Sequence, residues 1–119
     1  MPIALAHERD NLYRMEISGL MRRADYDATE AEMKRIVDSG RTMKLLCVLR
    51  GFQGWEKQVD WSNLTFYLTH GDAIERIAIV GDEQWRDLTS MFAGADLRKA
   101  PVEFFPEAEM SEARAWLNA

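Results

Sequence analysis

Cysteine, histidine and proline are scarce in this sequence, and each shortage excludes a class of protein. A single cysteine, Cys47, leaves no partner for an internal disulfide, so the chain is not cross-linked like a small secreted domain. Its two histidines, His7 and His70, have no second ligand at a metal-binding spacing, and we expect neither a metal nor another cofactor. No proline-rich or glycine-rich linker divides the 119 residues, so we expect one domain over residues 1–119.

Basic charge and long apolar runs are also lacking. The chain has 20 acidic and 15 basic residues and a net charge of -5, which excludes a broad basic surface for nucleic acid. No apolar run approaches the roughly 20 residues of a membrane helix, and Glu8 and Asp10 interrupt the first residues before a signal-peptide core develops. We expect a cytoplasmic protein without a nucleic-acid partner or an integral membrane segment; a transient membrane contact stays open.

What the chain does have is a regular alternation of strand and helix patterns. Apolar stretches typical of strands cover residues 3–6, 12–18, 44–50, 74–80 and 102–105. Apolar residues at helical spacing cover residues 25–37, 61–68, 85–92 and 110–117. A polar turn separates the first two strands, whereas helices separate the later ones. This order predicts the α/β class, with a mixed, mostly parallel sheet of about five strands, an opening antiparallel hairpin and four helices.

Short motifs at fixed places along this pattern point to a family. They are Ser18-Gly19, Ala24-Asp25-Tyr26, Phe52-Gln53-Gly54-Trp55, Asp60-Trp61, Ile77-Ala78-Ile79-Val80-Gly81-Asp82, Trp85, Phe104-Phe105-Pro106 and Glu112-Ala113-Arg114-Ala115-Trp116-Leu117. Together they resemble the STAS fold of bacterial anti-sigma-factor antagonists, and more narrowly the SpoIIAA-like family of small bacterial proteins. The resemblance spans nearly the whole chain and implies the fold, but one fold hosts many activities, so it does not assign a function.

The connection after the central strand departs from the pattern of true antagonists. Those proteins carry a phosphorylatable serine at the helix start that follows this strand. Here residues 51–55 hold no hydroxyl side chain, and Ser62 is the first one to follow. A kinase-operated switch of the antagonist type is therefore not expected. The fold also resembles the CRAL-TRIO type, in which an apolar ligand lies between the sheet and a mobile helix, and this implies a small-ligand site.

Residues 52–70 are unusually rich in aromatic side chains, and they form our candidate site. The candidate binding residues, for a ligand or a partner, are Phe52, Trp55, Trp61, Phe66 and Tyr67. On a helix, Phe66 and Tyr67 project away from the face that carries Trp61, so these rings cannot all face the sheet. Either neighbouring loops cover them, or they form an apolar groove or an interface. We predict that Gly51 and Gly54 form a hinge turn before this segment.

Other polar residues have structural interpretations. An acidic run on the first helix is interpreted as its solvated face; it comprises Asp25, Asp27, Glu30 and Glu32. Asp82 and Glu83 lie where acids cap a helix start. Cys47 lies in the most apolar strand, where we expect a buried and unreactive thiol.

The residues favour a non-enzymatic binding or regulatory module that acts through residues 52–70. Its partner is expected to be an apolar, lipid-like small molecule or another protein. Two alternatives stay open at this point: a homodimer that uses the same aromatic residues without a ligand, and a small enzyme with a pocket there. In the second case Asp60 or His70 would be the acid or base, but no nucleophile, base and orienting group is found together.

Overall fold

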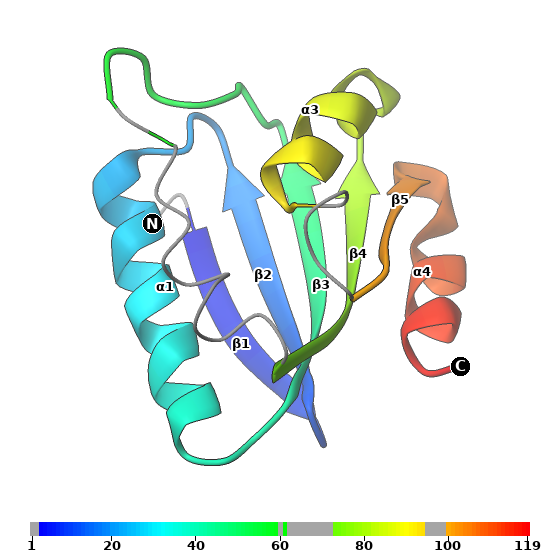
Figure 1. Cartoon of the computed structure of the whole chain (residues 1–119). Helices are drawn as coiled ribbons and strands as arrows, with labels where there is room; N and C mark the ends of the chain where they lie inside the picture. The colour runs from blue at the N-terminus through cyan, green and yellow to red at the C-terminus, as the bar shows by residue number, and fades with distance from the viewer. Residues whose placement is uncertain (1–2, 60, 62–72, 95–99) are drawn as a thin grey trace.

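The computed structural model describes residues 3–59, 61, 73–94 and 100–119, and within them a five-stranded sheet has its strands in chain order (Figure 1). The strands are β1 (Ile3–Arg9), β2 (Leu12–Ser18), β3 (Met43–Arg50), β4 (Ile74–Gly81) and β5 (Val102–Pro106). β1 and β2 pair antiparallel, and each later strand pairs parallel with the one before it. The mixed sheet with an opening hairpin is therefore confirmed.

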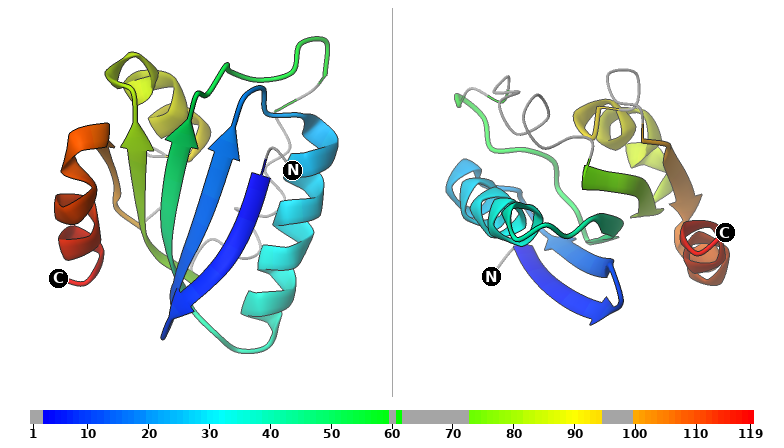
Figure 2. Two further views of the ribbon diagram at one scale, coloured as in Figure 1. Left: turned by 180° about the vertical axis from the view of Figure 1, so that it is seen from behind. Right: turned by 60° about the horizontal axis from the view of Figure 1, so that its bottom comes forward.

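Helices lie on both faces of this sheet. They are α1 (Arg23–Asp38), α3 (Arg86–Phe92) and α4 (Met110–Leu117), with short 3-10 turns at η2 (Glu83–Trp85) and η3 (Glu107–Glu109). Figure 2 shows α1 and α3 on one face and α4 on the other. The described residues thus contain three α-helices rather than the four expected; except for Trp61, the fourth, over residues 61–68, lies outside the described residues.

Local chemistry explains the ends of α1. At its start, the backbone N–H of Arg23 donates to the Glu56 carboxylate at 3.0 Å, so a side chain 33 residues away caps the helix. Its buried side chains are Thr29, Met33 and Val37, which recur at helical spacing. At its end, Gly40 has φ of 92°, a left-handed conformation that glycine adopts without strain.

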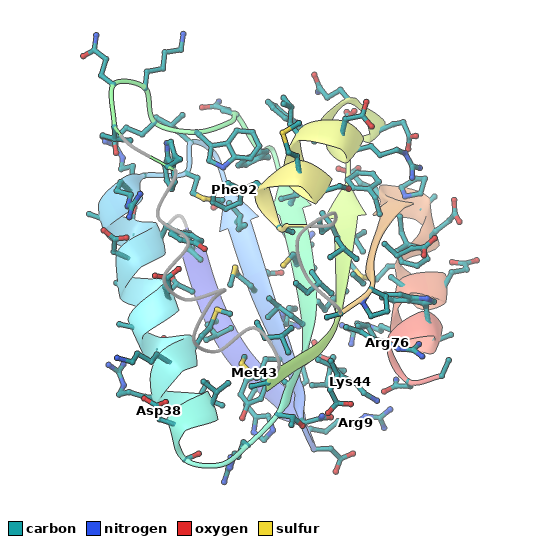
Figure 3. The ribbon with its side chains drawn as sticks, viewed as in Figure 1. Arg9, Asp38, Met43, Lys44, Arg76 and Phe92 are labelled. Carbon is teal, nitrogen blue, oxygen red and sulfur yellow. The ribbon has the colours of Figure 1, made fainter. Side chains whose placement is uncertain are left out.

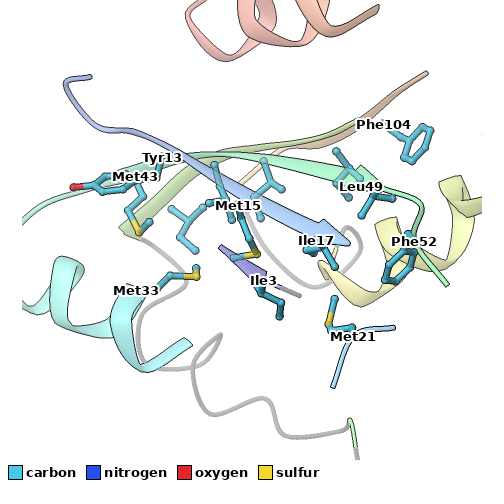
Figure 4. Packing of buried hydrophobic residues seen from close by; sticks show 14 of the residues in the cluster. Ile3, Tyr13, Met15, Ile17, Met21, Met33, Met43, Leu49, Phe52 and Phe104 are labelled. Atoms are coloured by element: carbon cyan, nitrogen blue, oxygen red, sulfur yellow. The ribbon is translucent and has the colours of Figure 1, made fainter. Parts of the chain in front are cut away.

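The alternation of side chains along the strands divides the core into two clusters, one on each face of the sheet. The larger cluster lies on the face covered by α1 and α3, called the α1/α3 face, and Figure 4 shows its packing. The smaller lies on the face covered by α4, called the α4 face; its buried members are Leu12, Leu46, Val48, Ala78, Val80, Ala113 and Leu117.

Candidate functional site

An apolar cavity of about 70 Å³ lies on the α1/α3 face, between the sheet and the two helices. The described residues that line it are Met15, Ile17, Met21, Tyr26, Glu30, Met33, Leu45, Cys47, Leu49, Phe52, Trp55, Ile74, Ile77, Ile79, Thr89, Phe92 and Ala93. Strands β2, β3 and β4 supply the floor, α1 one wall, and the end of α3 the other. Figure 4 shows Met33 by α1, Met15 on the sheet, and Phe52, from the segment after β3, beside α3. The lining is almost wholly aliphatic and aromatic.

An aromatic cluster borders this cavity and contains three of the predicted site residues. Its members are Tyr26, Phe52, Trp55, Trp61, Trp85 and Phe92. Their ring centroids lie 4.8 to 6.1 Å apart, mostly edge to face, the arrangement that aromatic quadrupoles favour. Phe92, labelled in Figure 3, contacts Tyr26, Trp55 and Trp61, so it lies at the centre of the cluster.

Backbone hydrogen bonds fix the loop that carries Phe52 and Trp55. Gly54 accepts from the N–H of Met21 at 2.9 Å, and Glu56 donates to the carbonyl of Met21 at 2.8 Å, which makes a one-residue parallel bridge between Met21 and Trp55. Gly51 and Gly54 have φ of 56° and 96°, as a tight turn requires. The loop therefore holds the two aromatic rings beside the start of α1. Whether the glycines act as a hinge stays a prediction.

Trp61 is held by polar contacts as well as by rings. Its Nε1–H donates to the Glu56 carbonyl at 3.0 Å, and the Arg23 guanidinium lies 5.5 Å from its ring centroid. Arg23 also pairs with Asp27 at 2.9 Å. Phe66 and Tyr67, the other two predicted site residues, lie outside the described residues, as do Asp60 and His70.

The indole N–H of Trp55 differs from that of Trp61. It exposes less than 1 Å² and has no hydrogen-bond partner within the described part of the chain. A buried donor in this state costs about 1–3 kcal/mol relative to one with a partner. Such donors are rare in folded proteins and call for a physical explanation.

Glu30 corrects one interpretation of the sequence. It is not on the solvated face of α1: it is half-buried and lines the cavity. Burial raises the pKa of its carboxyl above the ordinary value, and a hydrogen bond with Tyr26 opposes this rise. The sequence contained the signal, because Tyr26, Glu30, Met33 and Val37 follow one another at steps of four, three and four residues, which places them on one side of a helix.

Cys47 and Asp82 give a second correction and a confirmation. Cys47 is not a fully buried core residue; its half-buried thiol lines the cavity from β3. Asp82 caps a helix start as expected, because its carboxylate accepts from the backbone N–H of Gln84 at 3.0 Å. Trp85 and Phe92 were predicted only as helix-face residues, and their meeting with Trp55 depends on strand order, which local patterns do not contain.

Within the described ranges, no group of three or more His, Cys, Asp or Glu side chains is arranged to hold a metal ion. No described helix combines the length and the apolar character needed to cross a membrane.

Comparison with known proteins now identifies the family. Residues 12–118 match the family model described as SpoIIAA-like. Among solved structures, the fold is similar to that of an uncharacterised protein with a SpoIIAA-like fold from Shewanella loihica PV-4, with a TM-score of 0.72 and 19% sequence identity. The match covers 97% of this chain and 91% of that one. A search of curated proteins finds no match. The family match extends over most of the chain, and the chain therefore belongs to the SpoIIAA-like family.

Proposed function

We propose that this STAS-type chain is a non-enzymatic binding module of the cytoplasm, and that its ligand is an apolar, lipid-like small molecule. The observation that carries the proposal is the cavity on the α1/α3 face, whose described lining is almost wholly apolar. Binding sites for small molecules are typically concave and apolar, with a few polar groups that orient the ligand. This cavity has such a composition, and it favours binding over catalysis.

The size of the cavity requires that its walls adapt to a ligand. An engineered apolar cavity of about 150 Å³ is known to bind benzene, whereas this one encloses about 70 Å³. Three methionines line it, Met15, Met21 and Met33, and they come from β2, the segment before α1, and α1 itself. Methionine is unbranched and flexible, so such walls re-pack around different shapes. A lipid-like ligand therefore enlarges the cavity by moving these side chains.

The alternatives from the sequence depend wholly or partly on residues outside the described ones. A homodimer or a protein interface was predicted through the same aromatic residues, of which Phe66 and Tyr67 lie outside the described residues, and a small enzyme through Asp60 or His70, which also lie outside them. The apolar cavity, by contrast, is built from described residues, which is why we favour the small ligand.

The test is a titration with prodan, a neutral naphthalene ketone whose fluorescence shifts to the blue in apolar surroundings. The wild type is expected to give a saturable blue shift. Met33→Trp places a large ring in the cavity and is expected to weaken binding by about tenfold or more, equivalent to ~1.4 kcal/mol. Met91→Trp introduces the same ring at a side chain that is 70% exposed on α3, and serves as the matched control.

Circular dichroism shows whether Met33→Trp keeps its fold, and Cys47→Met is a smaller cavity-filling variant with the same expected direction. The proposal is wrong if the wild type binds prodan without saturation. It is also wrong if folded Met33→Trp and Cys47→Met bind as well as Met91→Trp, because the dye then lies outside the cavity.

A further inference from the structure

Two lining residues of the cavity carry polar groups that stand out: Trp55, whose buried indole N–H has no partner in the described structure, and Glu30, with its carboxyl group. From these we infer that the ligand is an uncharged molecule with an apolar chain and one hydroxyl group, such as a long-chain alcohol. The hydroxyl oxygen accepts from Trp55, and its proton is donated to Glu30. This inference rests on the proposed function, because it takes the cavity as the ligand site and names the chemistry of the ligand.

The first argument is the unused donor of Trp55. Trp61, in the same cluster, satisfies its own N–H with the Glu56 carbonyl at 3.0 Å, whereas that of Trp55 has no partner in the described structure. The ring of Trp55 is wedged between those of Phe52, Trp85 and Phe92, which supply no carbonyl or carboxylate oxygen from their side chains. A ligand oxygen that separates these rings removes the penalty of the buried donor. The protein thereby gains more from a ligand with an acceptor than from a plain hydrocarbon.

The second argument is the position of Glu30 relative to Trp55. Tyr26 links them, since it hydrogen-bonds with Glu30 and its ring lies 5.3 Å from that of Phe92, which in turn lies 5.5 Å from Trp55. A carboxylate has about four acceptor positions, so the Tyr26 bond leaves room for a second donor. A hydroxyl group is the smallest neutral group that both accepts and donates a hydrogen bond.

Charge excludes the related carboxylic acids as preferred ligands. A ligand carboxylate beside Glu30 meets a like charge in surroundings of low polarity, and this juxtaposition is unfavourable. The neighbouring charged groups do not reverse this, because Arg23 already pairs with Asp27 at 2.9 Å and the two charges largely offset each other. The cavity is thus expected to prefer an alcohol to the carboxylate of equal chain length.

The experiment measures displacement of prodan by three molecules of similar length: decanol, methyl decyl ether and decanoate. The ether accepts a hydrogen bond but cannot donate one, and decanoate carries the negative charge. For the wild type at neutral pH we expect decanol to bind about threefold to tenfold more tightly than either, the value of one hydrogen bond of ~0.5–1.5 kcal/mol.

Two variants separate the roles of the two residues. Trp55→Phe keeps a ring but removes the N–H. It is expected to weaken the binding of decanol and of the ether by similar factors. Glu30→Gln removes the charge. It is expected to strengthen the binding of decanoate relative to that of decanol, so that the preference for decanol over decanoate disappears. Glu32→Gln, an exposed acid on the same helix, is the matched control and is expected to change none of the three affinities.

The outcomes distinguish this inference from the function on which it rests. If prodan does not bind the wild type, the proposed function fails. If prodan binds but decanoate competes as well as decanol, or if Glu30→Gln leaves the preference unchanged, the inference is overturned and the cavity remains a site for apolar molecules in general. Should Trp55→Phe lose prodan binding altogether, the Glu30→Gln comparison alone decides.

Discussion

The two faces of the sheet are made by the same strands but are packed in different ways. On the α4 face, small and branched side chains meet closely: Ala78, Ala113, Leu46 and Leu117 are all fully buried. On the α1/α3 face, methionines and aromatic rings surround a cavity, a carboxyl group and a donor without a partner in the described structure. The two faces therefore differ in what borders their free space. A hollow of about 190 Å³ at the start of α4 is bordered by the charged side chains of Arg50 and Glu107, whereas the cavity of the α1/α3 face is almost wholly apolar.

Ion pairs extend the same contrast. Beside α4, Glu8 on β1 accepts hydrogen bonds from Arg114 on α4 and from Arg14 on β2, so a single carboxylate joins three elements. Arg76 on β4 donates to the Trp116 carbonyl on α4 and lies 5.2 Å from its ring centroid. The α4 face thus fixes its helix by both apolar and charged contacts.

The largest expected effect comes from shortening a buried leucine of α4, with an exposed leucine of α3 as the control. Leu117→Ala removes a fully buried side chain of α4 and is expected to lower the free energy of unfolding by about 2–5 kcal/mol. Leu88→Ala, on α3, shortens a side chain that is 50% exposed and is expected to change it by less than about 0.5 kcal/mol. Urea denaturation followed by circular dichroism measures both. Equal losses would contradict the close packing of Leu117 on the α4 face.

Larger side chains are expected to change the free energy of unfolding by a smaller amount, and in opposite directions on the two faces. Ala78→Met inserts atoms at a fully buried alanine of the α4 face and is expected to lower the free energy of unfolding by about 1–3 kcal/mol. Cys47→Met adds atoms beside the cavity and is expected to leave it unchanged or raise it by up to about 1 kcal/mol, while weakening prodan binding. Thermal unfolding and dye titration are the measurements. A strongly destabilised Cys47→Met would show that the cavity has no usable space.

The smallest effects are expected from two carboxyl groups whose pKa values shift in opposite directions. The Arg114 hydrogen bond lowers the pKa of Glu8 below 4.5, so its stabilisation is present above that pH and lost as the pH falls through the folded-state value. Burial raises the pKa of Glu30 above 4.5. The contribution of the protonated carboxyl to the free energy of unfolding is therefore complete below pH 4.5, and it is lost as the pH rises through the pKa of the folded state. The two faces therefore predict opposite responses to acid.

Glutamine substitutions test this difference. At neutral pH, Glu8→Gln is expected to lower the free energy of unfolding by about 1 kcal/mol, and Glu30→Gln to raise it slightly. In urea titrations repeated near pH 4, the free energies of unfolding of both variants are expected to lie closer to that of the wild type. Changes of the same sign in the two variants at neutral pH, or differences that do not depend on pH, would contradict the contrast.

Most of the fold followed from local patterns, and the exceptions have identifiable causes. β4 and α4 lie where apolar spacing places them, because each buries one regular face. β1, by contrast, continues to Arg9 through polar residues that were assigned to a turn. Pairing with β2 extends it, and Glu8 finds its partner in Arg114, far away along the chain. Only the tertiary structure supplies such a partner.

The candidate site was only partly predictable, for a related reason. Phe52, Trp55 and Trp61 were found because aromatic residues are concentrated in one segment, and the structure brings them together. Phe92 joins them from α3 because the ends of β3 and β4 are neighbours, a relation that no single segment reveals. Glu30 was missed because its charge suggested solvent, although its spacing from Tyr26 and Met33 indicated the cavity side of α1.

The order of the strands also has a consequence for how a ribosome makes this protein. Because β1 to β5 pair in chain order, each strand after the first emerges when its neighbour has already been synthesised, and none has to insert between two earlier strands. During translation the sheet therefore grows at one edge. β5, the last of the described strands along the chain, ends in Pro106 and follows Pro101, residues whose nitrogens donate no hydrogen bond. The edge that β5 forms is thus a poor template for strands of other chains.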